Sequence, residues 1–297
     1  MDRFQRIADA FAQVQKQACV LLETTDGAAV FSNDAWQKEI GTGITRVISN
    51  GSKIEKGAIN FSKVSGPITP SMEATTGLKE GNYSATGVSS IFHPNNPLAP
   101  IIHMNIRYFE LSNGKAWFGG GIDLTPHYID VEEARNFHRA VKKICDAFDA
   151  SYYPIFKQQA DDYFFLQHRN ETRGAGGIFY DHLLVNEQSW QKLLDFSVAL
   201  GKLYPEIYAD ILNKKSTLPF SQKQEQWQKL RRSRYVEFNL MYDRGTQFGL
   251  QSNGNVESIL VSMPPDAQWN YNYSPEPGSD EEKTMNFLKK GINWLDL

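Results

Sequence analysis

The chain has 297 residues and a formal net charge of −3, with 41% hydrophobic and 22% charged residues, as in an ordinary globular protein. It carries no basic excess that could neutralise a phosphate backbone, so we expect no nucleic-acid partner. Its two cysteines, Cys19 and Cys145, lack a CxxC partner, which argues against a zinc site of that kind and against a disulfide framework.

The N-terminal segment predicts a helix over residues 1–23, because apolar side chains recur on one stripe of it, at Phe4, Ile7, Phe11 and Val14. No secretory signal is visible, and the segment is too acidic for a mitochondrial presequence, so we expect a cytoplasmic protein. Residues 82–106 lack Asp, Glu, Lys and Arg, but three prolines rule out a membrane-spanning helix there.

Strands dominate the next part of the chain. Residues 24–66 are rich in Gly, Ser and Thr and predict short strands with turns. Two further strands are expected at Ile101–Leu111 and Lys115–Leu124, and the Asn113–Gly114 pair between them is typical of a hairpin. The two strands should therefore pair antiparallel.

The strand over residues 101–111 has an unusual polar face. Its alternation places His103, Asn105 and Arg107 on one side of a sheet and apolar residues on the other. An imidazole, an amide and a guanidinium in one row would suit the floor of a site for a ligand with carboxylates.

Helices are predicted beyond this point. Asp130 and Glu133 form a capping-box pattern at a helix start. The other helices are expected at about 154–168, 187–202, 204–213, 222–232 and, after Ser279, 279–290. Strands are predicted at 235–242, 248–251 and 256–263. The fold class is α/β of the α+β type: one domain, 1–297, with a large, mostly antiparallel sheet and helices on both faces. Neither a GxGxxG nor a P-loop motif occurs, so no nucleotide cofactor is suggested.

Histidines and arginines supply the candidate chemistry. All six histidines lie between positions 93 and 182. A metal site formed by His93, His103, His138 and His168 is one interpretation, and separate histidines that hydrogen-bond locally are the other. Arg107 and Arg244 lie in or at the end of predicted apolar strands, where each should need a carboxylate from the protein or from a ligand.

Two aspartates are further candidates, because each ends a predicted strand beside glycines. Asp123 follows Phe118–Gly121, and Asp243 precedes Arg244 and Gly245. Such positions are common both in active sites and in plain turns, and the spacing does not separate the two interpretations.

Taken together, five segments resemble the oxygen-dependent coproporphyrinogen-III oxidase family. They are GVSSIFHPNNPLAPIIHMNIRYFE, WFGGGIDLTP, DDYFFLQHRNETRGAGGIFYDHL, YVEFNLMYDRGTQFGLQ and ESILVSMPP, and they occur in the family's order. The resemblance implies oxidative decarboxylation of two propionates of coproporphyrinogen III to vinyl groups, which gives protoporphyrinogen IX, with dioxygen as co-substrate and without an organic cofactor. It also implies a homodimer, with subunit contacts in the 235–270 region.

The resemblance assigns roles residue by residue. It implies a catalytic group of His103, Asp243 and Arg244, and a substrate-binding group of Ser89, Asn105, Ile106, Arg107, Asp123, Asn253, Gly254 and Asn255. It makes His93, His103, His138 and His168 candidate ligands of a divalent cation such as manganese. Two departures from the family pattern stand out: Asn255 replaces an expected arginine, and His182 replaces an expected aspartate.

Two other functions compete with this interpretation. The histidines could belong to a metallo-oxygenase or metallohydrolase, which metal analysis and chelation would reveal. The chain could also bind a porphyrinogen without turning it over, if Asn255 has disabled catalysis.

Overall fold

The computed structural model describes residues 2–73, 77–251 and 255–297, and its centre is a seven-stranded antiparallel sheet in the order β1-β2-β3-β4-β5-β6-β9. The strands are β1 (Ser32–Lys38), β2 (Gly41–Ser49), β3 (Ile54–Pro67), β4 (Asn82–Pro94), β5 (Ile101–Leu111), β6 (Ala116–Thr125) and β9 (Gly176–Leu184). A separate two-stranded ribbon pairs β7 (Phe165–Leu166) with β8 (Glu171–Thr172). The predicted antiparallel α/β fold is confirmed.

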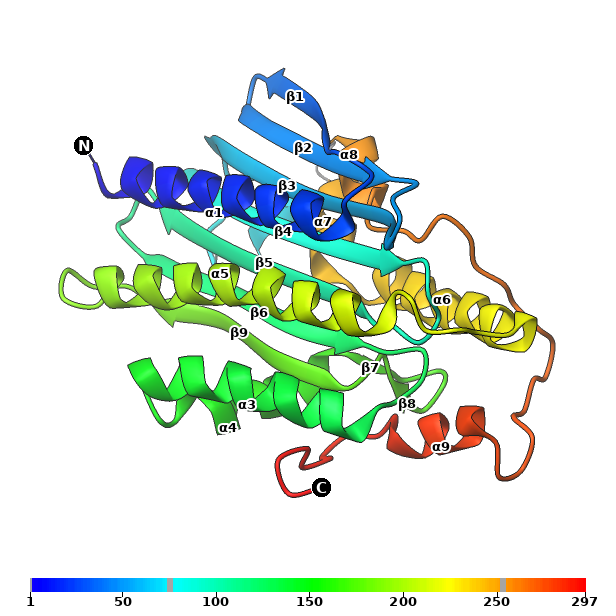
Figure 1. Cartoon of the computed structure of the whole chain (residues 1–297). Helices are drawn as coiled ribbons and strands as arrows, with labels where there is room; N and C mark the ends of the chain where they lie inside the picture. The colour runs from blue at the N-terminus through cyan, green and yellow to red at the C-terminus, as the bar shows by residue number, and fades with distance from the viewer. Residues whose placement is uncertain (1, 74–76, 252–254) are drawn as a thin grey trace.

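Helices cover both faces of the sheet. Figure 1 shows α1 (Arg3–Asp26), α5 (Trp190–Lys215) and the pair α3 (Val131–Phe148) and α4 (Tyr152–Tyr163) in front of it, on what we call the first face. Behind it, against the second face, lie α6 (Gln222–Met241), α7 (Arg244–Gln251) and α8 (Val256–Leu260). The short η1 (Pro70–Met72) precedes β4, and α9 (Asp280–Phe287) lies near the C-terminus.

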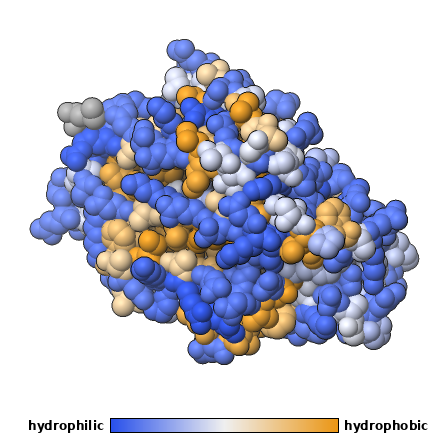
Figure 2. Space-filling view, in the orientation of Figure 1, coloured by the Kyte–Doolittle hydropathy of each residue, from blue (hydrophilic) through white to orange (hydrophobic). Residues whose placement is uncertain are grey.

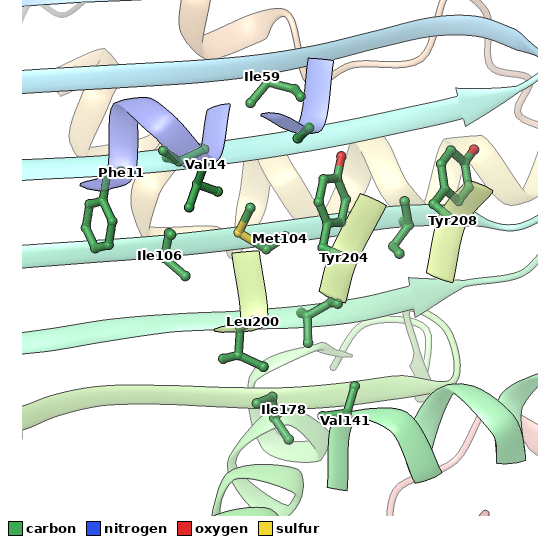
Figure 3. Packing of buried hydrophobic residues seen from close by; sticks show 14 of the residues in the cluster. Phe11, Val14, Ile59, Met104, Ile106, Val141, Ile178, Leu200, Tyr204 and Tyr208 are labelled. Atoms are coloured by element: carbon green, nitrogen blue, oxygen red, sulfur yellow. The ribbon is translucent and has the colours of Figure 1, made fainter. Parts of the chain in front are cut away.

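The main hydrophobic core fills the space between the first face and its helices. Figure 3 shows Met104 and Ile106 of β5 among Phe11 and Val14 of α1 and Leu200 of α5, and all five side chains are buried. Complete burial of one such side chain contributes about 1.5–3 kcal/mol. The outer surfaces of these helices are mostly hydrophilic, with smaller apolar groups between them (Figure 2).

Local signals gave several elements correctly. The hairpin between β5 and β6 closes at Gly114, whose φ of 86° is a conformation that glycine adopts readily. Asp130 and Ser279 cap α3 and α9 by accepting hydrogen bonds from the backbone N–H groups of Glu133 and Glu282. These caps confirm both predicted helix starts.

Three predicted strands are wrong, because residues 235–242, 248–251 and 256–263 are largely helical. The first belongs to α6, which runs unbroken to Met241, and the others overlap α7 and α8. Buried residues of α6 recur at Arg231, Tyr235, Phe238 and Asn239, which is helical spacing and overrides the apparent alternation.

Smaller differences concern helix limits. The two helices expected at 187–202 and 204–213 are one helix, α5, which continues through Pro205. The helix expected at 154–168 ends at Tyr163, and the last helix ends at Phe287. Strands β4 and β9 were not predicted. Across the described ranges, no helix is both long and apolar enough to cross a membrane.

Candidate functional site

The second face of the sheet carries polar side chains of β4 and β5. We call Ser89, His103, Asn105 and Arg107 the polar rows. In register, Ser89 of β4 lies opposite Asn105 of β5, and Gly87 lies opposite Arg107. His103, Asn105 and Arg107 are all partly exposed, whereas the residues between them are buried against the first face. The predicted polar face of this strand is confirmed. Ile106 differs from the other substrate-binding candidates, because its side chain lies in the core on the first face (Figure 3).

His103 begins a chain of three ionisable groups. Its Nδ1 lies 2.9 Å from Oδ1 of Asp123, its neighbour in register on β6. The other carboxylate oxygen, Oδ2, accepts a hydrogen bond from Nη2 of Arg173 at 2.6 Å. Asp123 and Arg173 each expose only 2% of their side chains, so Asp123 is placed to orient His103 rather than to meet a ligand directly.

The charge of Asp123 is stabilised by its partners. Burial alone would raise its pKa, but the guanidinium of Arg173 and the hydrogen bond from His103 outweigh burial and lower the pKa below its usual value. Arg173 itself is stacked against three aromatic rings, with its guanidinium carbon 4.4 Å from the Phe164 ring centre and 4.6 Å from that of Phe238. The carboxylate and the guanidinium therefore form a fixed pair under α6.

Arg107 has a different environment. Its Nη1 donates to Oδ1 of Asn105 at 3.0 Å, and its Nη2 lies 3.0 Å from Oδ2 of Asp181 on β9. Asp181 is therefore the carboxylate of the protein that pairs with Arg107, and the nearer acids in the sequence have other partners. Glu110 accepts a hydrogen bond from Tyr108, and Asp123 is paired with Arg173.

Asp243 and Arg244 lie at the start of α7, beside the polar rows. The Asp243 carboxylate accepts hydrogen bonds from the Tyr163 hydroxyl at 2.9 Å and from the Thr246 backbone N–H at 2.7 Å. The Tyr163 ring stacks on Phe179, with centroids 4.1 Å apart, and Phe179 is opposite Gly121 in the sheet. Tyr163 and Phe179 thus connect Asp243 to the row that contains Ser89 and Asn105.

Arg244 does not lie at the end of an apolar strand, as the sequence predicted. It is exposed at the first position of a helix rather than buried in an apolar strand. Its charge therefore needs no carboxylate partner to compensate for burial. Its guanidinium carbon lies 5.6 Å from the Tyr163 ring centre. The side chain is therefore near the polar rows and accessible to a ligand.

The region after α7 contributes polar contacts to the same face. The Ser258 carbonyl of α8 accepts a hydrogen bond from Asn60 of β3, and the Ser262 carbonyl bonds with His93 of β4. Asn255 immediately precedes α8 and is half-buried. The other two substrate-binding candidates in this region, Asn253 and Gly254, lie outside the described residues.

The four histidines named as candidate metal ligands bond with separate partners in the structure. His138 is buried and uses both ring nitrogens, one with the Tyr153 hydroxyl and one with the Ala175 carbonyl. His168 bonds with both Tyr242 and Glu237. Burial lowers the pKa of His93 well below its usual value. Within residues 2–73, 77–251 and 255–297, no three His, Cys, Asp or Glu side chains are grouped to hold a metal ion. These histidines form the local hydrogen bonds that the alternative interpretation expects, and as arranged here the set does not fit a divalent cation.

Sequence analysis missed Glu237, which joins several elements. Its carboxylate accepts hydrogen bonds from Arg169 at 2.6 and 2.9 Å, from His168 at 2.7 Å and from the Trp269 indole at 2.9 Å. Burial raises the pKa of Glu237, but these donors outweigh burial and lower the pKa to about 2. The strand predicted over residues 235–242 gave no sign of these contacts, because the partners of Glu237 are 32 to 69 residues away in the sequence.

Comparisons with known proteins agree with the resemblance found in the sequence. A family model described as coproporphyrinogen III oxidase matches residues 6–294. An oxygen-dependent coproporphyrinogen-III oxidase of soybean (Glycine max), described as chloroplastic, is 43% identical over 309 aligned positions. The alignment covers 99% of this chain and 79% of the soybean protein.

Proposed function

This chain belongs to the coproporphyrinogen III oxidase family and acts as an oxygen-dependent oxidase of coproporphyrinogen, and we propose that its substrate binds across the polar rows. The observation that carries the proposal is the partly exposed group of Ser89, Asn105 and Arg107 beside Asp243 and Arg244. A porphyrinogen with four propionates needs cations and hydrogen-bond donors around a broad macrocycle. Arg107 and Arg244 supply the cations, and the guanidinium fork suits a carboxylate.

Several positions beside Asn105 and Arg107 in the sheet are glycines and have no side chain. Gly87, Gly119 and Gly121 belong to β4 and β6 and are in register with Arg107 and Asn105 of β5. Without Cβ atoms, Gly87 and Gly121 add no side chain above the sheet, while the Arg107–Asp181 pair lies over Gly119 in the free protein. The apolar rings of Tyr163 and Phe179 at one side would contact the macrocycle, while Ser89 and Asn105 donate or accept hydrogen bonds.

Each of the two reaction rounds removes a hydrogen from the propionate β-carbon and breaks the bond to the carboxyl carbon. The propionate becomes a vinyl group and carbon dioxide, and the two electrons pass to dioxygen, which leaves as hydrogen peroxide with the released protons. In this scheme Asp243 accepts the pyrrole N–H proton, whose loss makes the ring electron-rich toward dioxygen, and Arg244 binds a neighbouring propionate. His103, oriented by Asp123, is the proton donor in this scheme. This scheme uses no metal ion, because His93, His103, His138 and His168 bond with separate partners and do not fit one.

The test is turnover with and without oxygen. Purified protein and coproporphyrinogen in air should give protoporphyrinogen and carbon dioxide, with about two dioxygen molecules consumed for each macrocycle, as two propionates require. The same mixture without oxygen should give no product. Anaerobic product formation would contradict the mechanism, and an inactive protein that still binds the substrate would support a non-catalytic binding role.

Assembly and location complete the proposal. We expect a homodimer with contacts in the 235–270 region, as the resemblance implies. A cytoplasmic location remains a prediction from the sequence, while the soybean relative is described as chloroplastic.

A further inference from the structure

Two ion pairs lie close together on the second face, and they differ sharply in exposure. Arg173 and Asp123 each expose 2% of their side chains, whereas Arg107 and Asp181 expose 35% and 22%. A partly exposed ion pair changes a folding or binding equilibrium constant by a factor of about five or less, because water competes for both charges. A buried pair cannot be opened without leaving an uncompensated charge. Only the Arg107–Asp181 pair is therefore open to exchange with a ligand.

The backbone that presents Asp181 is irregular. The pairing of β6 with β9 shifts register between Phe118 and Gly120. The next residue of β9 after Asp181, His182, has a φ of 53°, which is uncommon for a residue with a side chain. Its backbone N–H donates to Oδ1 of Asp181 at 3.0 Å, and its ring stacks on Trp117 with centroids 4.9 Å apart. This bulge directs the Asp181 carboxylate toward Arg107.

Gly119 makes the pair sterically feasible. A Cβ atom at this position would lie 2.7 Å from Oδ1 of Asp181 and 2.8 Å from Nε of Arg107. Such distances are too short for a Cβ atom, so another residue at 119 would require the Asp181 and Arg107 side chains to shift from these positions. The register shift in β6, the left-handed backbone conformation of His182 and the absence of a side chain at Gly119 together allow the Asp181 carboxylate to lie against Arg107.

We propose that Asp181 is a placeholder carboxylate, which pairs with Arg107 in the free enzyme and is displaced by a substrate propionate. This inference rests on the proposed function, in which Arg107 binds such a propionate. In the free state, Asp181 and Asn105 hold the guanidinium extended across Gly119, so little side-chain entropy is lost when the substrate arrives. The exchange lowers the affinity for carboxylates, because a propionate gains Arg107 only as Asp181 loses it. Asp181 is thus a specificity-determining residue that keeps binding of a multiply charged substrate reversible.

The experiment is a fluorescence titration with coproporphyrin, the oxidised macrocycle that carries the same four carboxylates. Asp181→Asn keeps the Oδ1 acceptor for the His182 N–H but removes the charge, so it should bind coproporphyrin about two- to fivefold more tightly. Asp181→Glu retains a competing carboxylate and should bind like the wild type. Asp162→Asn removes an equal charge from an exposed pair with Lys290 and should also leave binding unchanged.

The gain should appear in turnover as a lower KM at similar kcat, and it should shrink at high salt as charges are screened. Unchanged or weaker binding by both Asp181→Asn and a second variant, Asp181→Ser, would overturn the placeholder role. Arg107→Ala tests the underlying proposal separately. If its affinity for coproporphyrin and its turnover both match the wild type, Arg107 is not a propionate site, whatever the Asp181 variants do.

Discussion

Asp243 has two roles that one substitution can separate. Its carboxylate accepts the backbone N–H of Thr246, as an N-cap does, and it is also the proposed base for the pyrrole proton. Asparagine caps helices about as well as aspartate but cannot accept a proton at neutral pH. Asp243→Asn should therefore lower kcat/KM by about 10²–10⁴-fold, the usual contribution of a general base, while the melting temperature stays close to that of the wild type.

The control is Asp243→Ala, which removes both roles and should also reduce stability by about 0.5–2 kcal/mol, the usual cost of a lost cap. Steady-state kinetics and thermal unfolding on both variants make the comparison. If Asp243→Asn retained near-normal activity while Asp243→Ala melted lower, Asp243 would be a cap alone.

The sequence predicted the individual residues of the site better than their partners. A period of two was enough to place His103, Asn105 and Arg107 on one face, since alternation is a local property of a strand. The partners Arg173 and Asp181 depend on how β9 and the preceding loop pair with β6, more than 45 residues along the chain from Asp123 and about 70 from Arg107. No local pattern encodes that pairing, least of all where a bulge interrupts its register.

At the scale of elements, prediction succeeded where a cap or turn residue marked a boundary. It failed for α6 because the segment Tyr235–Tyr242 satisfies both periods: apolar residues alternate, and buried ones also follow from Arg231 at helical spacing. The capping box at Ser221 starts a helix whose length only tertiary packing determines. Arg232 on this helix is almost fully buried and bonds with Glu55 of β3 and the Pro94 carbonyl of β4, so it is part of the packing against the second face.

Glu237 links α6 to two other segments and gives a prediction of pH dependence. Its pKa falls from an ordinary 4.5 to about 2 in the folded protein, so its ionised form stabilises the fold at neutral pH. That contribution is fully present above the ordinary value and disappears as the pH drops from about 4.5 through 2. Glu237→Gln should melt at a lower temperature than the wild type at pH 7, and the difference should shrink steadily as the pH is lowered.

Urea unfolding at several pH values would measure this difference, and Glu132→Gln is the matched control. Glu132 is an exposed acid on α3 that pairs with Arg135, so its removal should leave the stability curve nearly unchanged. A stability loss in Glu237→Gln that is constant from pH 7 to pH 3 would mean that packing, rather than ionisation, explains the role of Glu237.

At the scale of the whole molecule, the sheet separates packing from chemistry. Its first face is a continuous apolar core under α1, α3, α4 and α5, while its second face combines helices with polar rows. Substitutions behind the first face should therefore act mainly on stability, and those on the second face mainly on turnover.

The second face also bears the proposed subunit contact. Large apolar side chains are exposed at the end of α6 and in the segments that follow, at Leu240, Met241, Leu250 and Val256. Exposed apolar residues gathered in one region are typical of protein–protein contacts. Because the resemblance also places the dimer in this region, we expect sedimentation at micromolar concentration to give a two-subunit mass, which Leu240→Glu together with Val256→Glu should shift to one subunit. Val30→Glu is the matched control, since Val30 is more exposed than either but lies between α1 and β1, away from residues 235–270. A wild-type protein that sediments as a stable monomer, or a Val30→Glu variant that dissociates as readily, would exclude this surface as the dimer contact.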